Sequence, residues 1–138
     1  MKIFYDGACG FCKVCVALLI RWDRDGCLDP IAIQDPEGQR LLAPIPAPER
    51  LDSAHLMTAS GEILSGAEGA PELLRQLPGG RPLAALLALA MPLTRLVYRL
   101  VTAARPAIGS ILPATWGRWA TRLIAERRHG TTLPTASL

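Results

Sequence analysis

The sequence is poor in aromatic residues, has no cysteine after position 27 and is almost free of acidic residues over its last 58 positions. Phe, Trp and Tyr make up 5% of the 138 residues, so aliphatic side chains must fill most of any core. Half of the chain is hydrophobic, which suits one globular domain. A disulfide-stapled secreted protein would spread its cysteines along the chain. The sequence therefore argues against a structural disulfide framework.

Long apolar runs are also absent. Residues 1–6 contain no run that could form a signal peptide. The longest apolar stretch, residues 83–93, is too short for a bilayer, which needs ~20 residues, and arginines follow it. We expect a cytoplasmic protein whose thiols are free or transiently paired.

Several motifs that would indicate other functions are missing. There is no glycine-rich phosphate loop and no Gly-x-Ser-x-Gly segment. The basic region lacks the interleaved aromatics and the recognisable module of a nucleic-acid-binding protein. We therefore expect neither nucleotide-driven chemistry nor a nucleic-acid partner.

Charge divides the chain into two parts. Residues 1–80 carry a net charge of −4, whereas residues 81–138 carry +7, with eight arginines and Glu126 as the only acid. The second part is also the more apolar. This division predicts a core over residues 1–80, a helical extension packed on it over 81–128, and a flexible tail over 129–138.

Hydrophobic periodicity in the first part alternates between strands and helices. We expect strands at 2–5 and 31–33, a hairpin of 55–58 with 62–64, and helices at 13–23, 39–43 and 67–77. This order predicts an α/β fold, a thioredoxin-like mixed sheet with flanking helices and an appended helical C-terminal segment.

The C-terminal segment predicts an amphipathic final helix with Trp116, Trp119, Leu123 and Ile124 on one face. Short interrupted apolar helices usually belong to a core. We therefore favour helices that pack on the sheet, with arginines solvated or paired to the acidic first part. The alternative is contact with an anionic membrane surface.

The chemistry of the chain is carried by Cys9-Gly10-Phe11-Cys12, which follows a strand and a turn and opens a helix. Free backbone N–H groups and the helix dipole at such a position favour a thiolate, the nucleophile of disulfide exchange. Cys12 lies about one helical turn further on, within reach of a mixed disulfide at Cys9. We predict that Cys9 attacks and Cys12 resolves.

Three neighbours are candidate supporting residues. Asp6 is either a proton acceptor for Cys12 or an ordinary turn and cap residue, and the latter is favoured. Gly7 completes the turn. Lys13 could stabilise a thiolate, although a solvated helix position is the simpler interpretation.

The other cysteines raise the question of a metal. Cys9, Cys12 and Cys15 form a Cys-x-x-Cys-x-x-Cys run, but the further cysteine of a bacterial iron–sulfur motif is missing. One helix would scatter these side chains over different faces. We expect no metal and no cofactor, with Cys15 and Cys27 as packing residues and His55 as an ordinary strand residue.

The stretch from Ile3 to Cys12 resembles the signature of the DCC family of thiol-disulfide oxidoreductases, Asp-x-x-Cys-x-x-Cys. The resemblance covers roughly residues 2–112 and includes Trp22-Asp23, the segment 31–34, the segment 55–67, and 92–98 with Ala104-Arg105. It implies a thioredoxin-like fold and a redox role for Cys9 and Cys12. Two features depart from related patterns. Residues 51–55 lack the proline that thioredoxins place in cis before the third strand, and residues 105–109 read Arg-Pro-Ala-Ile-Gly where the family more often continues as a helix with arginine and tyrosine.

The sequence thus predicts an enzyme, a thiol-disulfide oxidoreductase acting on a disulfide-containing protein or small molecule. One alternative is a non-catalytic thioredoxin-fold module that binds a partner or membrane through its basic helices. A second alternative is a cysteine-based metal-binding protein.

Overall fold

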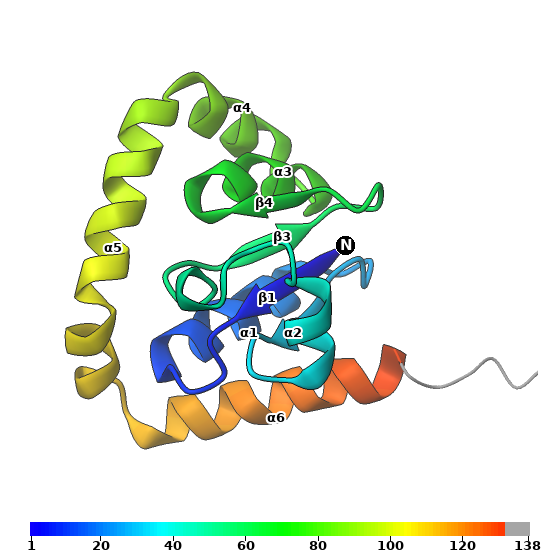
Figure 1. The fold of residues 1–138 in the computed structure, drawn as a ribbon, viewed down its shortest axis with the longest axis vertical. Coiled ribbons are helices and arrows are strands. Elements are labelled where there is room, and N and C mark those ends of the chain that lie inside the picture. The colour runs from blue at the N-terminus through cyan, green and yellow to red at the C-terminus, as the bar shows by residue number, and fades with distance from the viewer. Residues whose placement is uncertain (132–138) are drawn as a thin grey trace, which may run out of the picture.

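The computed structural model describes residues 1–131 of the chain (Figure 1). Its elements in chain order are β1 (Lys2–Tyr5), α1 (Gly10–Trp22), β2 (Asp29–Ala32), α2 (Pro36–Leu41), β3 (His55–Met57), β4 (Ile63–Ser65), α3 (Gly69–Gln76), α4 (Arg81–Leu89), α5 (Met91–Ile111) and α6 (Ala114–Thr131). Short 3₁₀ turns lie at Ala47–Glu49 and Gly66–Glu68. The predicted tail, residues 129–138, lies outside the described residues except for 129–131, which continue α6.

The four strands form one mixed sheet in the order β2-β1-β3-β4. β1 runs parallel to β2 and antiparallel to β3, and β3 and β4 form the predicted antiparallel hairpin. Helix α1 provides the long connection that the parallel pair of β1 and β2 requires. The predicted α/β, thioredoxin-like fold is confirmed.

Alternate residues of β1 enter two different cores. Ile3 and Tyr5 pack with Val16 and Ile20 of α1 and with Ile124 of α6 on one face of the sheet. Phe4 points to the opposite face, where it packs with Ile31, Ile33 and Leu42. Burial on both faces makes β1 the centre of the fold and fixes the strand from which the site loop leaves.

Helix α6 lies along α1, as Figure 1 shows below the sheet. Ala17 of α1 and Ala120 of α6 are completely buried, and these small side chains let the two helices approach closely. Trp119, Leu123 and Ile124 contribute to this interface as predicted. Trp116 does not, because it lies in the first turn of α6 and is 52% exposed.

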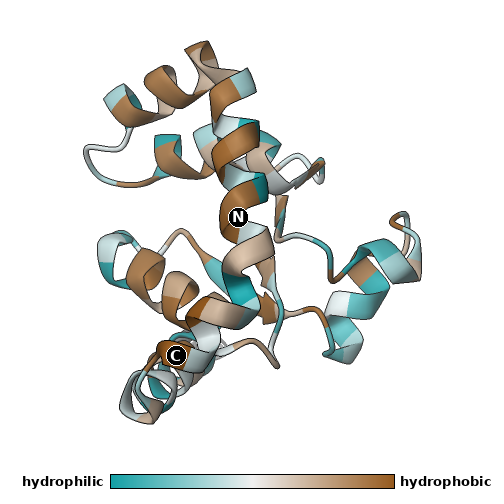
Figure 2. Cartoon of the chain, turned by 90° about the vertical axis from the view of Figure 1, so that its left-hand side faces the viewer, coloured by the Kyte–Doolittle hydropathy of each residue, from teal (hydrophilic) through white to brown (hydrophobic). Residues whose placement is uncertain are grey.

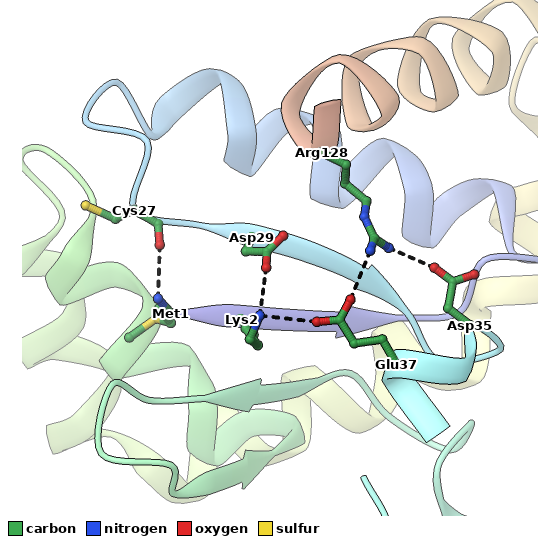
Figure 3. Close-up of polar contacts among 7 residues, drawn as sticks. All are labelled: Met1, Lys2, Cys27, Asp29, Asp35, Glu37 and Arg128. Atoms are coloured by element: carbon green, nitrogen blue, oxygen red, sulfur yellow. Dashed lines mark hydrogen bonds and ion pairs between the residues drawn. The ribbon is translucent and has the colours of Figure 1, made fainter. Parts of the chain in front are cut away.

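Ion pairs join the acidic first part to the basic second part. Arg128 of α6 reaches Asp35 and Glu37 beside the N-terminus of α2, and Lys2 of β1 pairs with Asp29 and the same Glu37 (Figure 3). In the same region, the terminal amine of Met1 donates to the Cys27 carbonyl at 3.1 Å. The charge asymmetry of the sequence therefore becomes a set of contacts across the fold.

Helices α4 and α5 meet at a bend of 98°. In the part of the chain that the structure describes, neither these nor any other single helix has the length and apolarity of a membrane span, although α4 and α5 together meet that test. None of the residues of α5 is fully buried. Pro106 lies inside α5, which continues past it to Ile111.

Candidate dithiol active site

Cys9 caps the N-terminus of α1. The backbone leaves β1 at Tyr5, turns through residues 6–9 and adopts an extended conformation at Cys9 (φ −92°, ψ 114°) before the helix begins at Gly10. The Sγ of Cys9 accepts a hydrogen bond from the backbone N–H of Cys12 at 3.3 Å. A sulfur at this position faces the free N–H groups and the positive end of the helix dipole, both of which favour an anion. The helix starts three residues earlier than expected, which places Cys12 in its first turn.

Cys12 faces inward. Its side chain lines a cavity of about 230 Å³ enclosed by α1, the sheet, α3 and α5. The pKa of the Cys12 thiol is raised to about 12, chiefly by desolvation, with smaller contributions from its hydrogen bond with Cys9 and from the charge of Cys9. Cys12 is therefore a protonated thiol at neutral pH. The neighbouring sulfur, Cys9 Sγ, lies instead at the N-terminus of α1.

The walls of the cavity are largely apolar. They come from side chains of α1, β3, β4, α3 and α5, including Phe11, Val16, Leu19, Leu56, Leu64, Leu73 and Val101. Polar groups reach it from Asp6, Tyr98, Thr102 and Arg105. The cavity thus combines a largely apolar lining with a few polar groups, as ligand and active sites commonly do.

Arg105 is the cationic group beside the dithiol. Its Nη1 donates to Cys12 Sγ at 3.9 Å, and its Nη2 donates to the carbonyls of Leu51 and Asp52, each at 3.4 Å. The Arg105 guanidinium opposes the rise in the pKa of Cys12 that burial causes. A cation held here favours the thiolate form of Cys12 relative to the same site without it.

Pro106 helps to hold Arg105 in place. A proline inside a helix cannot donate to the carbonyl four residues earlier, here that of Thr102. The Nε of Arg105 donates to this Thr102 carbonyl at 3.3 Å. The guanidinium therefore satisfies a carbonyl that the proline leaves free, which fixes its orientation toward Cys12.

Asp6 and Gln34 organise the loop before Cys9. Oδ1 of Asp6 accepts from the backbone N–H of Ala8 at 2.9 Å, which is the turn role favoured from the sequence. Gln34, just beyond β2, donates from Nε2 to the same Asp6 oxygen at 2.6 Å and accepts from the Gly7 N–H through Oε1 at 2.9 Å. Asp6 also borders the cavity with Cys12, so its proton-transfer role stays a prediction.

Gly7 leaves room for this contact. A Cβ at position 7 would lie 3.1 Å from the Ala32 Cβ and 3.2 Å from Gln34 Oε1. Either contact is tight enough to displace its neighbour. The close approach of the loop to the end of β2 therefore favours glycine at this position.

Lys13 lies on a different side of α1. It lines an open groove between the start of α1 and α6, together with Arg118 and Arg122, and does not border the cavity that holds Cys12. Its backbone N–H donates to the Cys9 carbonyl at 3.1 Å. The structure thus brings Cys9, Cys12, Asp6 and Gly7 together and directs Lys13 away from Cys12.

The remaining cysteines are separated from each other. Cys15 borders the cavity one turn after Cys12, and burial raises its pKa. Cys27 is exposed in the loop after α1, so the expectation that it packs in the interior is wrong. Within residues 1–131, no three His, Cys, Asp or Glu side chains are grouped so that they could hold a metal ion.

His55 is a buried strand residue with both ring nitrogens engaged. Nδ1 lies 2.8 Å from the Ser65 hydroxyl, and Nε2 lies 2.9 Å from the Arg50 carbonyl. Burial lowers the pKa of His55. These contacts tie β3 to β4 and to the preceding loop.

The segment before β3 also meets α5. The backbone N–H of Ala54 donates to the Tyr98 hydroxyl at 3.0 Å, and the Ala54 carbonyl accepts from the Gly66 N–H. As the sequence indicated, the described residues contain no cis peptide bond at this position or elsewhere. The backbone groups of Ala54 are satisfied within the protein.

The sequence analysis missed three residues of this site: Gln34, Tyr98 and Arg105. Tyr98 and Arg105 are seven positions apart and share one face of α5 with Thr102, a spacing that the sequence does contain. No local spacing in the sequence points to Gln34, because its partner Asp6 lies in a loop 28 residues earlier in the chain.

Comparison with known families gives one result. A family model described as DCC1-like thiol-disulfide oxidoreductase matches residues 3–111, well over half of the chain. The match ends where α5 ends, so α6 lies beyond it. Comparisons with curated proteins and with solved structures gave no match.

Proposed function

The chain belongs to the DCC1-like thiol-disulfide oxidoreductase family, and from this we propose that it exchanges disulfides through Cys9 and Cys12. In this proposal Cys9 attacks the substrate and Cys12 resolves the mixed disulfide. The substrate is a disulfide-containing protein or small molecule.

The observation that supports this assignment best is the difference between the two sulfurs. Cys9 Sγ sits at the helix N-terminus and accepts an N–H bond, which suits a thiolate nucleophile. Cys12 is half-buried in the cavity wall, and desolvation is the main cause that raises its pKa to about 12, which suits a thiol that stays protonated until the second step. A resolving thiol that stays protonated does not compete for the first attack.

The cycle balances as two exchanges. The Cys9 thiolate attacks one sulfur of the substrate disulfide, forming a Cys9–substrate disulfide and releasing the other substrate sulfur as a thiolate. Cys12 then loses its proton and attacks Cys9 Sγ, which breaks the mixed disulfide and releases the second substrate thiolate. The substrate gains two electrons and becomes two thiols, and the protein dithiol is oxidised to the Cys9–Cys12 disulfide. An external thiol donor restores the dithiol by the reverse steps.

Arg105 contributes to the second exchange. Its contact with Cys12 Sγ lowers the cost of forming the Cys12 thiolate, the step that burial makes difficult. Asp6 borders the same cavity and is the candidate acceptor for the Cys12 proton. The first exchange needs neither group.

Stoichiometric reduction of an aromatic disulfide by the pre-reduced protein tests this proposal. Every protein in this test carries Cys27→Ser, because the exposed Cys27 thiol would itself react with the reagent. In this background the otherwise unchanged chain and Cys15→Ser, the matched control on the same helix, should each release both aromatic thiols per chain and become internally oxidised. Cys12→Ser should release one and retain the other as an adduct, whereas Cys9→Ser should lose the fast reaction. A Cys9→Ser variant that reduces the reagent at the wild-type rate would overturn the proposal.

A further inference from the structure

Helix α5 carries an apolar stripe on its exposed side, and Val101, the most buried side chain of this stripe, also borders the cavity. Leu93, Leu96, Val97, Leu100 and Val101 are between 41% and 62% exposed. Their spacing is that of a single helix face. Figure 2, which looks onto this side of the molecule, shows hydrophobic segments along α5 and α4.

The stripe continues across the bend into α4. Leu86 and Leu89 are 59% and 87% exposed. We define the α4–α5 ridge as seven exposed apolar side chains on either side of this bend: Leu86, Leu89, Leu93, Leu96, Val97, Leu100 and Val101. Isolated exposed leucines are common, but a contiguous set of this kind marks an interaction surface.

Packing within the chain does not account for the ridge. The opposite face of α5 bears Tyr98, Thr102 and Arg105, and these polar residues face the cavity and the Ala54 segment. A helix that only packed on a core would turn its leucines inward and these groups outward. The orientation of α5 therefore serves the site on one face and leaves the other free for a partner.

The charged residues of the two ridge helices themselves have a single sign. Residues 81–111 contain Arg81, Arg95, Arg99 and Arg105 and no acidic residue. Arg95 pairs with Glu68 of the core, but Arg81 and Arg99 form no ion pair or hydrogen bond with any side chain among the described residues. An exposed apolar face bordered by free arginines complements a surface that is both apolar and anionic.

From this combination we propose that the α4–α5 ridge docks on an anionic lipid membrane, with α5 lying in the interface plane. A second copy of the chain fits less well, because pairing two ridges would bring arginines of one copy against those of the other. Insertion across the bilayer would bury Arg95 and Arg99 in hydrocarbon, whereas docking in the plane leaves them at the headgroups. If both proposals hold, disulfide exchange takes place at a membrane surface, but docking of the ridge does not depend on the redox function.

Flotation with lipid vesicles tests the proposal. The full chain should bind phosphatidylcholine vesicles that contain phosphatidylserine and not vesicles of phosphatidylcholine alone, with binding reduced by added salt. Replacing Arg81 and Arg99 with Gln should weaken binding roughly 30-fold, as expected for two arginines near an anionic surface. The triple variant Leu93→Gln/Leu96→Gln/Leu100→Gln should bind at least as weakly.

Controls separate docking from loss of folding. Leu18 and Leu51 are also exposed but lie outside the ridge, so Leu18→Gln/Leu51→Gln should bind vesicles like the wild type. The three ridge leucines do not border the cavity, so the triple variant should keep its helical circular dichroism and its reaction with disulfides in solution. The proposal is overturned if the wild type does not bind anionic vesicles. It is also overturned if the triple variant, folded and active, binds them as tightly as the wild type.

Discussion

The two cysteines of the proposed site are one helical turn apart and experience different surroundings. Cys9 lies at the cap, where its sulfur accepts an N–H bond, whereas Cys12 lies against an apolar cavity that raises its pKa to about 12. The difference follows from the point at which α1 begins. Because the helix starts at Gly10, the first cysteine stays outside it and the second turns inward.

Arg105 should control the resolving step. Replacing it with Met removes the cation beside Cys12 Sγ, so the pKa of Cys12 should rise further. A rise of about one pKa unit leaves about tenfold less Cys12 thiolate at neutral pH. We expect the mixed disulfide at Cys9 to form at the normal rate and to resolve roughly tenfold more slowly.

Rapid quenching and mass spectrometry of the adduct measure both steps. Arg99→Met, on the exposed side of the same helix, is the matched control and should leave both rates unchanged. Equal resolution rates in Arg105→Met and wild type would show that the guanidinium does not assist Cys12.

His55 should make stability depend on pH. Burial lowers its pKa in the folded protein below 6.5, so the unfolded chain binds a proton more readily as pH falls through that value. The contribution of His55 is therefore fully present above about pH 6.5 and is lost as pH falls below it. We expect the free energy of unfolding to decrease from about pH 7.5 to about pH 5.5.

Urea denaturation across this range measures the slope. His55→Gln should flatten it even if the variant is less stable overall, and His129→Gln should retain it. A wild-type stability that does not change with pH over this interval would contradict the assignment.

At the scale of elements, α6 is held to α1 by a buried ion pair as well as by apolar packing. The Asp23 side chain is 0% exposed and pairs with Arg127 at 2.7 Å. It also accepts from the backbone N–H groups of Cys27 and Leu28, which closes the loop after α1. One carboxylate thus stabilises a helix end, a loop and a distant helix.

Replacing Asp23 with Ala should therefore be costly. The change leaves the Cys27 and Leu28 N–H groups and the Arg127 guanidinium without this partner, and we expect a loss of about 3 kcal/mol in the free energy of unfolding. Asp25 is exposed in the same loop, and Asp25→Ala should change stability by no more than about 0.5 kcal/mol. Chemical denaturation of both variants tests this, and similar losses in the two would contradict the role given to Asp23.

Most elements of the core could be predicted from the sequence because their patterns are local. Alternation and turn residues located β1 and the β3–β4 hairpin, and periodicity located α1 and α3 to within a few residues. The start of α1 depends on the cap conformation of Cys9, which periodicity does not encode. Amphipathicity predicts that the leucines of α5 pack inward, whereas the structure exposes them, so the outward ridge could not be foreseen.

At the scale of the whole molecule, the two oppositely charged parts of the chain are joined by ion pairs. Glu68 with Arg95 and Asp23 with Arg127 connect the first 80 residues to α5 and α6 respectively. The sequence predicted this complementarity as a general property. It could not assign the pairs, because each joins positions 27 or more residues apart, which only the tertiary fold brings together.

α5 occupies a central place in this arrangement. One face presents Tyr98 and Arg105 to the site, and the other bears the apolar ridge. If the ridge docks on a membrane, the dithiol site therefore lies on the side of α5 that faces away from the membrane. The candidate dithiol could be predicted from the four residues 9–12. The contact of Arg105 with Cys12 could not, because only the tertiary fold brings positions 12 and 105 together.

The central claim is that Cys9 attacks and Cys12 resolves, and trapping the intermediate tests it most directly. The pre-reduced Cys12→Ser variant is mixed with a disulfide substrate, and the modified cysteine is identified by peptide mass mapping. The account predicts a stable mixed disulfide on Cys9, with Cys15 and Cys27 unmodified over the same interval. An adduct that forms first on another cysteine, or no adduct on Cys9, would contradict it.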